Sequence, residues 1–234
     1  MKHTRTILSG IVFIVLMLFS FASCKCPVES DNVVIEPKAK ASINIIHAVN
    51  SAGAYKVEAW NRTLIEKLEY GQEKFDYVSI GAGECDLTFT PITPDDDSLF
   101  AVKYPLTPVQ GEAYTLVLSG YITPQDPIFI NDRIDHYRSD RAYIRFVNAI
   151  SAYPYDDTDF WVKIISLETE KIAAGEYTVF FEVDVTTFDL ELSSKFWMAA
   201  FELTPEVGKL YTIVIRGDKK LGWYDFKKIV TDKK

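Results

Sequence analysis

The chain of 234 residues has few of the side chains that most often carry catalysis, with only three histidines and three cysteines. His3 lies in the N-terminal apolar region, which leaves only His47 and His136 in the rest of the chain. The sequence contains no G-x-S-x-G, no H-E-x-x-H and no pair of neighbouring histidines, which are patterns of common hydrolases and zinc peptidases. We therefore expect no catalytic residues and no cofactor, and an enzyme is a remote alternative.

Basic residues are also in the minority, with 25 Lys and Arg against 33 Asp and Glu, a formal net charge of −8. Loss of the first 23 residues, with Lys2 and Arg5, would leave a net charge of −10. A protein that binds nucleic acid needs a clustered basic face against the phosphates. The composition therefore argues against nucleic acid as a partner.

One long apolar run is present, from Ile7 to Ala22, and it follows a short basic start. This order is typical of an export signal, and the run is shorter than the roughly 20 apolar residues of a spanning helix. Residues 21–24, FASC, resemble the lipobox of bacterial lipoproteins in a relaxed form similar to that of Bacteroidota. The resemblance implies a signal peptide over residues 1–23 and a diacylglyceryl group, with fatty acids such as palmitate, on Cys24. An ordinary secretory signal or a signal anchor is the alternative.

Residues 24–40 are predicted to form a lipidated tether, because PVESDNVVIEPKAK has two prolines, mixed charge and little periodicity. Each buried methylene of a lipid contributes about 0.8 kcal/mol, so two or three chains hold a protein on a membrane almost permanently. We therefore expect the protein at the cell outer membrane, lipid-anchored, and either periplasmic or surface-exposed. The membrane would be its partner through the lipid.

An internal repeat follows the tether. Three pairs of segments match in the same order: ASINIIHAVN (41–50) with AYIRFVNAIS (142–151), CDLTFT (85–90) with FDLELS (188–193), and LTPVQGEAYTLVLSG (106–120) with LTPEVGKLYTIVIRG (203–217). A period near 100 residues is the size of a domain. We therefore predict two domains, over residues 41–138 and 139–234.

Both copies read as short strands, and only TLIEKLEY, residues 63–70, could form about two turns of helix. Alternating apolar residues predict the following half-buried strands: Ile43/Ile45, Phe75/Tyr77, Leu87/Phe89, Tyr114/Leu116/Leu118, Ile144/Phe146, Val162/Ile164, Tyr177/Val179/Phe181/Val183, Leu190/Leu192 and Tyr211/Ile213/Ile215. The predicted fold class is all-β, with two tandem antiparallel immunoglobulin-like β-sandwich domains.

The L-T-P segment of each copy carries a glycine and then a tyrosine, at Gly111 and Tyr114 and at Gly208 and Tyr211. This spacing resembles the tyrosine corner of immunoglobulin-like sandwiches, in which a tyrosine hydroxyl bonds to the backbone a few residues upstream. The two tyrosines are therefore expected to be structural; the alternative is that they stack on a ligand. His47 corresponds to Asn148 in the second copy, which favours a structural hydrogen bond at that position as well.

The strand openings IIHAV (45–49) and RFVNA (145–149), each followed by the L-T-x-x-x-G-x-x-Y-T segment, resemble domain-of-unknown-function family 4397 over about Ala41–Gly217. The resemblance implies β-sandwich domains, often in tandem, on bacterial secreted proteins and lipoproteins. That family has no established catalytic residues, so no chemistry comes with the resemblance.

Cys26 and Cys85 are the two remaining thiols, and an exported protein sits where disulfides persist. A bridge between them would contribute about 4 kcal/mol by loop entropy. The alternative is a buried free thiol at Cys85, which lies beside alternating strand positions and corresponds to Phe188.

Acidic clusters in predicted loops are weak candidates for calcium. They comprise Asp95, Asp96, Asp97, Asp156, Asp157 and Asp159. Carboxylates at this spacing suit Ca²⁺, but neither cluster supplies about six ligands in order, and loop carboxylates are mostly solvated. We therefore predict no metal site.

Function is expected to be non-catalytic: a structural or adhesive module of the cell envelope that binds a protein or a glycan through loops or a sheet face. The four tryptophans, Trp60, Trp161, Trp197 and Trp223, are candidates to stack on sugars or to fill the core. The alternative is a subunit of a surface fimbria-like assembly, which would polymerise by donating a strand to a neighbour.

Overall fold

The computed structural model places residues 35–234 in one compact unit. It describes residues 36–49, 53–71, 76–92, 101–121, 123–124, 127–150, 159–164, 170–195, 197–218 and 223–232. Cys24 and Cys26 lie outside the described residues. No helix in these ranges is long and apolar enough to cross a membrane.

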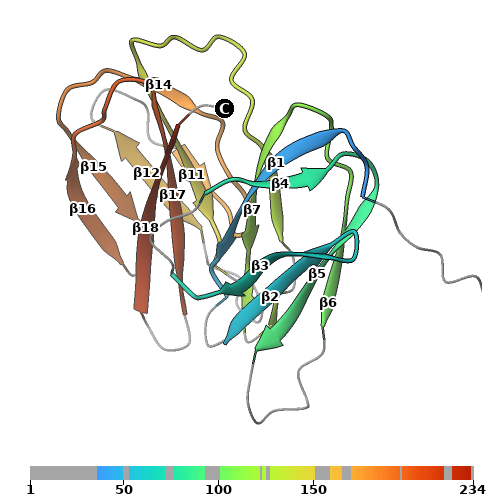
Figure 1. Cartoon of the computed structure of the whole chain (residues 1–234). Coiled ribbons are helices and arrows are strands. Elements are labelled where there is room, and N and C mark those ends of the chain that lie inside the picture. Colours follow the sequence, from blue (N-terminus) through green and yellow to red (C-terminus); the bar gives the residue numbers. More distant parts are fainter. Residues whose placement is uncertain are drawn as a thin grey trace, which may run out of the picture. The chain divides into compact units, whose positions relative to one another are not determined.

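The fold is all-β, and its strands form two tandem β-sandwiches (Figure 1). The first sandwich packs the sheet β10-β7-β1-β4 against the sheet β3-β2-β5-β6. Its strands are β1 (Lys40–His47), β2 (Ala54–Ala59), β3 (Arg62–Leu68), β4 (Val78–Gly81), β5 (Cys85–Ile92), β6 (Val102–Leu106), β7 (Ala113–Leu118) and β10 (Ile128–Asn131). A small separate ribbon, β8 (Gly120–Tyr121) with β9 (Thr123–Pro124), connects β7 to β10.

The second sandwich packs the sheet β14-β11-β17-β18 against the sheet β13-β12-β15-β16. Its strands are β11 (Ala142–Asn148), β12 (Phe160–Ile164), β13 (Glu170–Ile172), β14 (Phe181–Val183), β15 (Phe188–Ser193), β16 (Met198–Leu203), β17 (Lys209–Asp218) and β18 (Trp223–Asp232). The strand order repeats that of the first sandwich, with β18 in the place of β10. The division between residues 138 and 139 stays a prediction.

One strand pair in each sandwich is parallel, although the sequence predicts antiparallel sheets. β1 pairs with β7 so that Ile43 lies opposite Tyr114, and β11 pairs with β17 so that Ile144 lies opposite Tyr211. These pairs join the first strand of each copy to the strand that carries Tyr114 or Tyr211, and a connection that includes the opposite sheet separates them, as parallel pairing requires. The register is the same in both copies.

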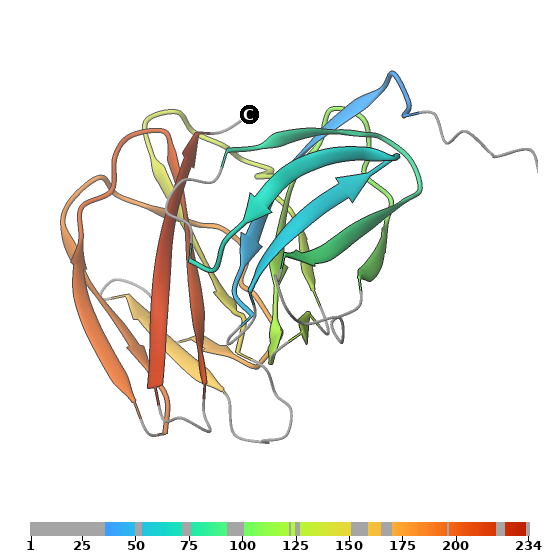
Figure 2. The same cartoon turned by 60° about the horizontal axis from the view of Figure 1, so that its bottom comes forward.

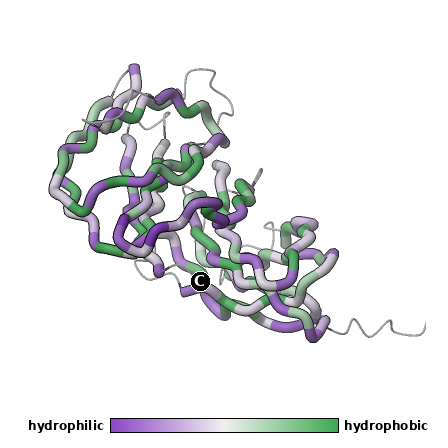
Figure 3. The backbone as a smooth tube through the Cα atoms, turned by 90° about the horizontal axis from the view of Figure 1, so that it is seen from above, coloured by the Kyte–Doolittle hydropathy of each residue, from purple (hydrophilic) through white to green (hydrophobic). Residues whose placement is uncertain are grey.

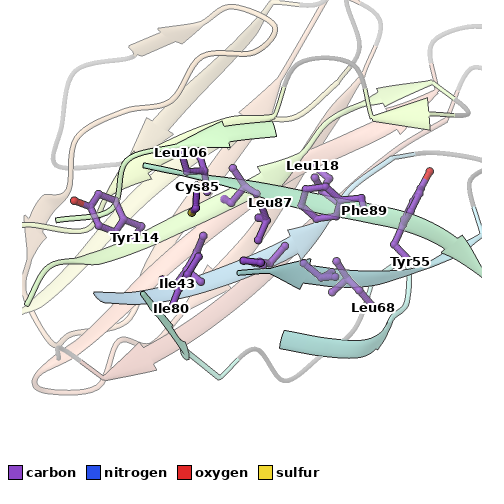
Figure 4. Close-up of a cluster of buried hydrophobic side chains, with 14 of the residues drawn as sticks. Ile43, Tyr55, Leu68, Ile80, Cys85, Leu87, Phe89, Leu106, Tyr114 and Leu118 are labelled. Carbon is purple, nitrogen blue, oxygen red and sulfur yellow. The ribbon is translucent and has the colours of Figure 1, made fainter. Parts of the chain in front are cut away.

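Each sandwich has its own apolar core. Figure 4 shows side chains of the first core pointing between its two sheets, among them Ile43, Leu87, Phe89 and Leu118. Along strands such as β2 burial alternates residue by residue, because one face of the sheet packs on the core and the other faces solvent. Figure 3 shows the corresponding alternation of hydropathy along the chain.

β1, β7 and β11 depart from this alternation, because almost every residue in them is buried. The outward faces of their sheets contribute to a third apolar cluster that takes side chains from both sandwiches: Ile46, Ala48, Val117, Ile128, Ile130, Val147, Ala149, Val214 and Ile229. The two sandwiches therefore share a buried contact, termed here the inter-sandwich face, in addition to their separate cores.

The helix considered for residues 63–70 is wrong, since this segment is strand β3. Ala59 pairs with Arg62, and Trp60 and Asn61 both have positive φ, at 53° and 55°. Two central residues with positive φ are the geometry of a type I′ turn, which turns β2 directly back into β3 (Figure 2). The usual Asn-Gly signal is absent from residues 60–61, so no strong local pattern marks this hairpin.

The strand predicted through Tyr177, Val179, Phe181 and Val183 is also partly wrong. Only Phe181–Val183 forms β14, and Tyr177 and Val179 are exposed, at 45% and 74%. The buried residue is Thr178, whose Oγ1 accepts a hydrogen bond from the Phe146 amide at 3.0 Å. A side-chain hydroxyl replaces part of the backbone ladder here, so the apolar residues on either side point outwards.

Candidate functional site

The two corner tyrosines are buried and bonded to the backbone. Tyr114 Oη accepts a hydrogen bond from the Val109 amide at 3.1 Å, and Tyr211 Oη accepts one from the Glu206 amide at 2.8 Å. Each amide lies five residues upstream of its tyrosine, as the tyrosine-corner motif requires. The rings are 5% and 2% exposed, which leaves no face open for a ligand.

A third tyrosine, Tyr143, repeats this contact outside the L-T-P motif. Its hydroxyl accepts from the Arg138 amide at 2.6 Å and donates to the His136 carbonyl at 3.3 Å. The bond fastens the end of the link between the sandwiches to β11. The sequence pattern missed it because no glycine or proline marks the turn.

His47 and Asn148 occupy equivalent, fully buried positions and make equivalent bonds. His47 Nδ1 accepts from the Val49 amide at 3.2 Å, and Asn148 Oδ1 accepts from the Ile150 amide at 3.2 Å. On their other side, His47 Nε2 lies 2.9 Å from the Gly53 carbonyl and Asn148 Nδ2 donates to the Ile172 carbonyl at 3.0 Å. These bonds require a neutral imidazole that carries its proton on Nε2.

Lowering the pH is expected to destabilise the fold through His47. Burial lowers the pKa of His47 below its ordinary value, the Gly53 carbonyl opposes this shift, and the charge of Arg216 adds to it. The unfolded chain therefore takes up the proton first, so the stabilisation is complete above about pH 6.5 and is lost as the pH falls towards the folded pKa. Urea unfolding from pH 7.5 to pH 5 measures this slope.

The matched variant is His47→Asn, which installs the residue of the second sandwich and preserves both hydrogen-bonding roles. It should reduce the dependence of unfolding free energy on pH relative to the wild type. His136→Asn makes the same substitution at an exposed position and is the matched control. Equal slopes in all three proteins would contradict the role assigned to His47.

A buried ion pair crosses the inter-sandwich face. Arg145 Nη1 on β11 lies 2.6 Å from Asp132 Oδ1, at the end of β10, and both side chains are 2% exposed. Arg145 also donates to Thr212 Oγ1 at 3.0 Å and to Thr115 Oγ1 at 2.7 Å. Its guanidinium carbon lies 4.4 Å from the centre of the Phe180 ring. The charge is thus paired, hydrogen-bonded and covered from both sandwiches.

Asp132 receives two further hydrogen bonds, so its second oxygen is also occupied. Thr115 Oγ1 donates to Asp132 Oδ2 at 2.9 Å, and Tyr77 Oη donates to the same oxygen at 2.6 Å. Burial, followed by the negative charge of Asp132, raises the pKa of Tyr77. The only sequence signal for this network is a single arginine inside the apolar stretch AYIRFVNAI. The groups of this network pair and hydrogen-bond with one another, which indicates a structural role.

Arg216 on β17 contacts the first sandwich through the Tyr70 ring and is held by Asp225 of its own sandwich. Its Nη2 donates to Asp225 Oδ2 at 2.8 Å, and its guanidinium carbon lies 4.5 Å from the centre of the Tyr70 ring. The turn at Gly71 approaches so closely that an added Cβ would lie 2.7 Å from Arg216 Nη1. A side chain at this position would have to displace the Arg216 guanidinium, and the φ of +71° also favours glycine.

Cys85 lies in the first core, where its thiol is buried, and burial raises the pKa of that thiol. Its predicted partner Cys26 is outside the described residues, as is the lipidation residue Cys24. Both the bridge and the lipidation therefore stay predictions.

The acidic candidates are not brought together. Asp95, Asp96, Asp97, Asp156 and Asp157 lie outside the described residues. The remaining one, Asp159, forms an ion pair with Lys171 at 2.6 Å. Within the described ranges, no group of three or more His, Cys, Asp or Glu could hold a metal ion.

The tryptophans differ in their surroundings. Trp60 packs against the first core, and Trp197 packs against the second, with its ring 5.8 Å from Phe160. The Trp223 side chain is outside the described residues. Trp161 is 37% exposed and stands on the outer face of the sheet β13-β12-β15-β16. That outer face is the candidate functional site.

Cross-strand pairing defines the rows of this outer face. Trp161 lies between Lys171 and Ser193, and Ser193 pairs in turn with Met198, which is 68% exposed. In the next row Lys163 pairs with Glu191, and Glu191 pairs with the exposed Ala200. An aromatic ring and a thioether thus stand on the outer face of the sheet, with charges of both signs nearby.

The family described as Domain of unknown function (DUF4397) matches residues 41–158, which include the first sandwich and β11. No curated protein matches the chain. Among solved structures, the chain is similar to the Bacillus anthracis TIE protein, with 10% sequence identity and a TM-score of 0.22. That similarity covers 76% of this chain and 33% of the other, so the chain spans about a third of its length. At this TM-score the similarity says nothing about function.

Proposed function

The chain belongs to the family described as Domain of unknown function (DUF4397), and from this premise we propose that it is a non-catalytic cell-envelope lipoprotein. In this role it is a structural or adhesive module that binds a protein or a glycan. A lipid on Cys24 anchors it to the outer membrane, and the tether separates the sandwiches from the bilayer.

The observation that carries the proposal is the inter-sandwich face. A cluster of nine apolar residues and the Arg145–Asp132 pair join the sandwiches, and residues 35–234 form one compact unit. A chain of separate domains on flexible linkers moves freely. A compact unit instead presents its exposed sheet faces in a constant arrangement, which suits a scaffold or an adhesive protein.

Cys24→Ala tests the anchor. The variant should be released from membranes, because without lipid chains it has lost the methylenes whose burial holds the protein on the bilayer. Cys26→Ala removes the neighbouring thiol and should remain in the membrane fraction after a carbonate wash. A Cys24→Ala protein that stays membrane-bound with its N-terminal residues uncleaved would contradict the lipoprotein assignment.

Adhesion is tested with intact cells that display the full chain, applied to matrix proteins and to an array of glycans. Cells with the wild-type chain should adhere to at least one of them, whereas cells with Cys24→Ala should not. Absence of adhesion to every surface would leave a scaffold role and remove the adhesive one.

The fimbria-like alternative requires a strand that leaves its own sheet. β18 is the natural candidate, and it pairs with β17 over ten positions, from Lys209 opposite Asp232 to Asp218 opposite Trp223. Donation to a neighbour would break all of this pairing. A stable monomer in sedimentation experiments would argue against the alternative.

A further inference from the structure

The duplicated fold provides an internal reference for the outer face that carries Trp161. Ser193 and Thr90 are equivalent in the repeat, and they lie opposite Trp161 and Lys56 respectively. Trp161 therefore occupies the position that Lys56 occupies in the first sandwich. There Lys56 forms an ion pair with Glu58 at 2.7 Å, so the equivalent surface is ionic.

A second lysine of the first outer face is replaced by an uncharged residue in the second sandwich. Thr88 pairs with Lys103 in the first sandwich, and the equivalent residue Glu191 pairs with Ala200 in the second. Two lysines of the first outer face are thus replaced by a tryptophan and an alanine. Since the sandwich forms with either set, stability does not demand an exposed tryptophan.

The Trp161 ring is accessible for contact. Its neighbours in the row are the small Ser193 and, one strand further, the exposed Met198. Within the residues that the structure describes, no other aromatic ring stacks on it; Phe160, Trp197 and Tyr224 contact one another on the inner side. The indole is 37% exposed, so part of its surface is available to a flat apolar partner.

The area of the face limits the size of that partner. The sheet has four strands of at most six residues, so with spacings of about 4.8 Å and 3.3 Å it covers roughly 400 Å². A stable protein complex buries about 800 Å² on each partner. The footprint of this face alone therefore suits a small ligand better than the standard interface of a stable protein complex.

We propose that the outer face of β13-β12-β15-β16 binds a neutral saccharide, with one pyranose ring packed on Trp161. This proposal rests on the proposed function and names its ligand class. A pyranose has a face of C–H groups that suits an indole, and its hydroxyls need donors and acceptors at the rim. Lys163 and Glu191 in the next row supply both kinds, and Lys171 beside Trp161 is held in its ion pair with Asp159. Because these charges have both signs, the face favours a neutral sugar over an anionic one.

The test uses the full chain, labelled with ¹⁵N, and a panel of neutral oligosaccharides that includes maltohexaose and cellohexaose. A binding oligosaccharide should shift the indole N–H signal of Trp161 and quench its fluorescence. Trp161→Lys, which installs the residue of the first sandwich, should weaken binding about tenfold or more. Trp161→Phe should retain most of the affinity because it keeps an aromatic face.

Val179→Ala is the control, since it removes an exposed apolar side chain that lies off this face. This variant should bind oligosaccharide as the wild type does. The melting temperatures of all variants should lie within about 2 °C of that of the wild type. The proposal is overturned if no oligosaccharide shifts the Trp161 signal, or if Trp161→Lys binds with unchanged affinity. It is also overturned if Trp161→Lys instead abolishes self-association in sedimentation experiments.

The adhesion experiment separates this proposal from the proposed function. Cells that display Trp161→Lys and still adhere as the wild type does would refute the saccharide site and keep the adhesive role. In the converse outcome the wild-type protein binds an oligosaccharide, but the Cys24→Ala variant stays on membranes. That result would refute the lipid anchor and keep the saccharide site.

Discussion

Arg145→Met is expected to lower the free energy of unfolding by about 3–5 kcal/mol, the usual cost of removing one partner of a buried ion pair. The substitution leaves the Asp132 carboxylate 2% exposed without its counter-ion and leaves two threonine hydroxyls without their donor. Methionine fills a similar volume, so the loss reports charge and hydrogen bonding more than a cavity. Urea unfolding at pH 7 measures it.

The double variant Arg145→Met with Asp132→Asn distinguishes an uncompensated charge from lost packing. Asparagine is neutral and still accepts from Tyr77 and Thr115, so stability should return to within about 2 kcal/mol of the wild type. Lys209→Met removes one partner of an exposed ion pair with Asp232 and should leave the midpoint nearly unchanged. A small effect of Arg145→Met alone would show that water reaches the pair in solution.

Gly71→Ala is expected to destabilise the protein by about 2–3 kcal/mol. A side chain at φ +71° is strained by about 1 kcal/mol, and the new Cβ would lie 2.7 Å from Arg216 Nη1. Arg216 cannot move away freely, because it is bound to Asp225 and covered by Tyr70. Thermal unfolding followed by circular dichroism measures the loss.

Gly175→Ala is the matched control within the same chain. The Gly175 amide donates to the Asn148 carbonyl as the Gly71 amide does to the His47 carbonyl, and its φ is +79°. An added Cβ at Gly175 meets nothing within 4 Å, so only the conformational cost of about 1 kcal/mol applies. Equal losses in the two variants would contradict a tight contact between Gly71 and Arg216.

The sequence predicts most accurately the strands that have one buried face and one solvent-exposed face. The pairs Leu87/Phe89 and Leu190/Leu192 lie on β5 and β15 with their side chains in the two cores, as their alternation indicates. Alternation is local information, since it needs only a covered and an uncovered face. It failed near Tyr177 and Val179, where a bond from the Phe146 amide to Thr178 reverses which residues point inwards.

The candidate site was only partly visible in the sequence. Trp161 is one of four tryptophans with two possible roles. Its alternation with Val162 indicates that it points outwards, and its exposure of 37% in the structure agrees. The importance of Arg145 was not apparent at all. A charged residue in an apolar strand predicts either an exposed face or a buried partner, and its partner Asp132 lies in a different sandwich.

The sequence by itself determined the all-β class, the duplication and the two tyrosine corners, because each depends on residues close together in the chain or repeated at one interval. The tertiary structure alone decided that β1, β7 and β11 are covered on both faces, and that the outer face with Trp161 stays open. The physical reason is that burial of a second sheet face depends on what packs against it. Here the inter-sandwich face does so, through side chains as distant in sequence as Ile46 and Ile229.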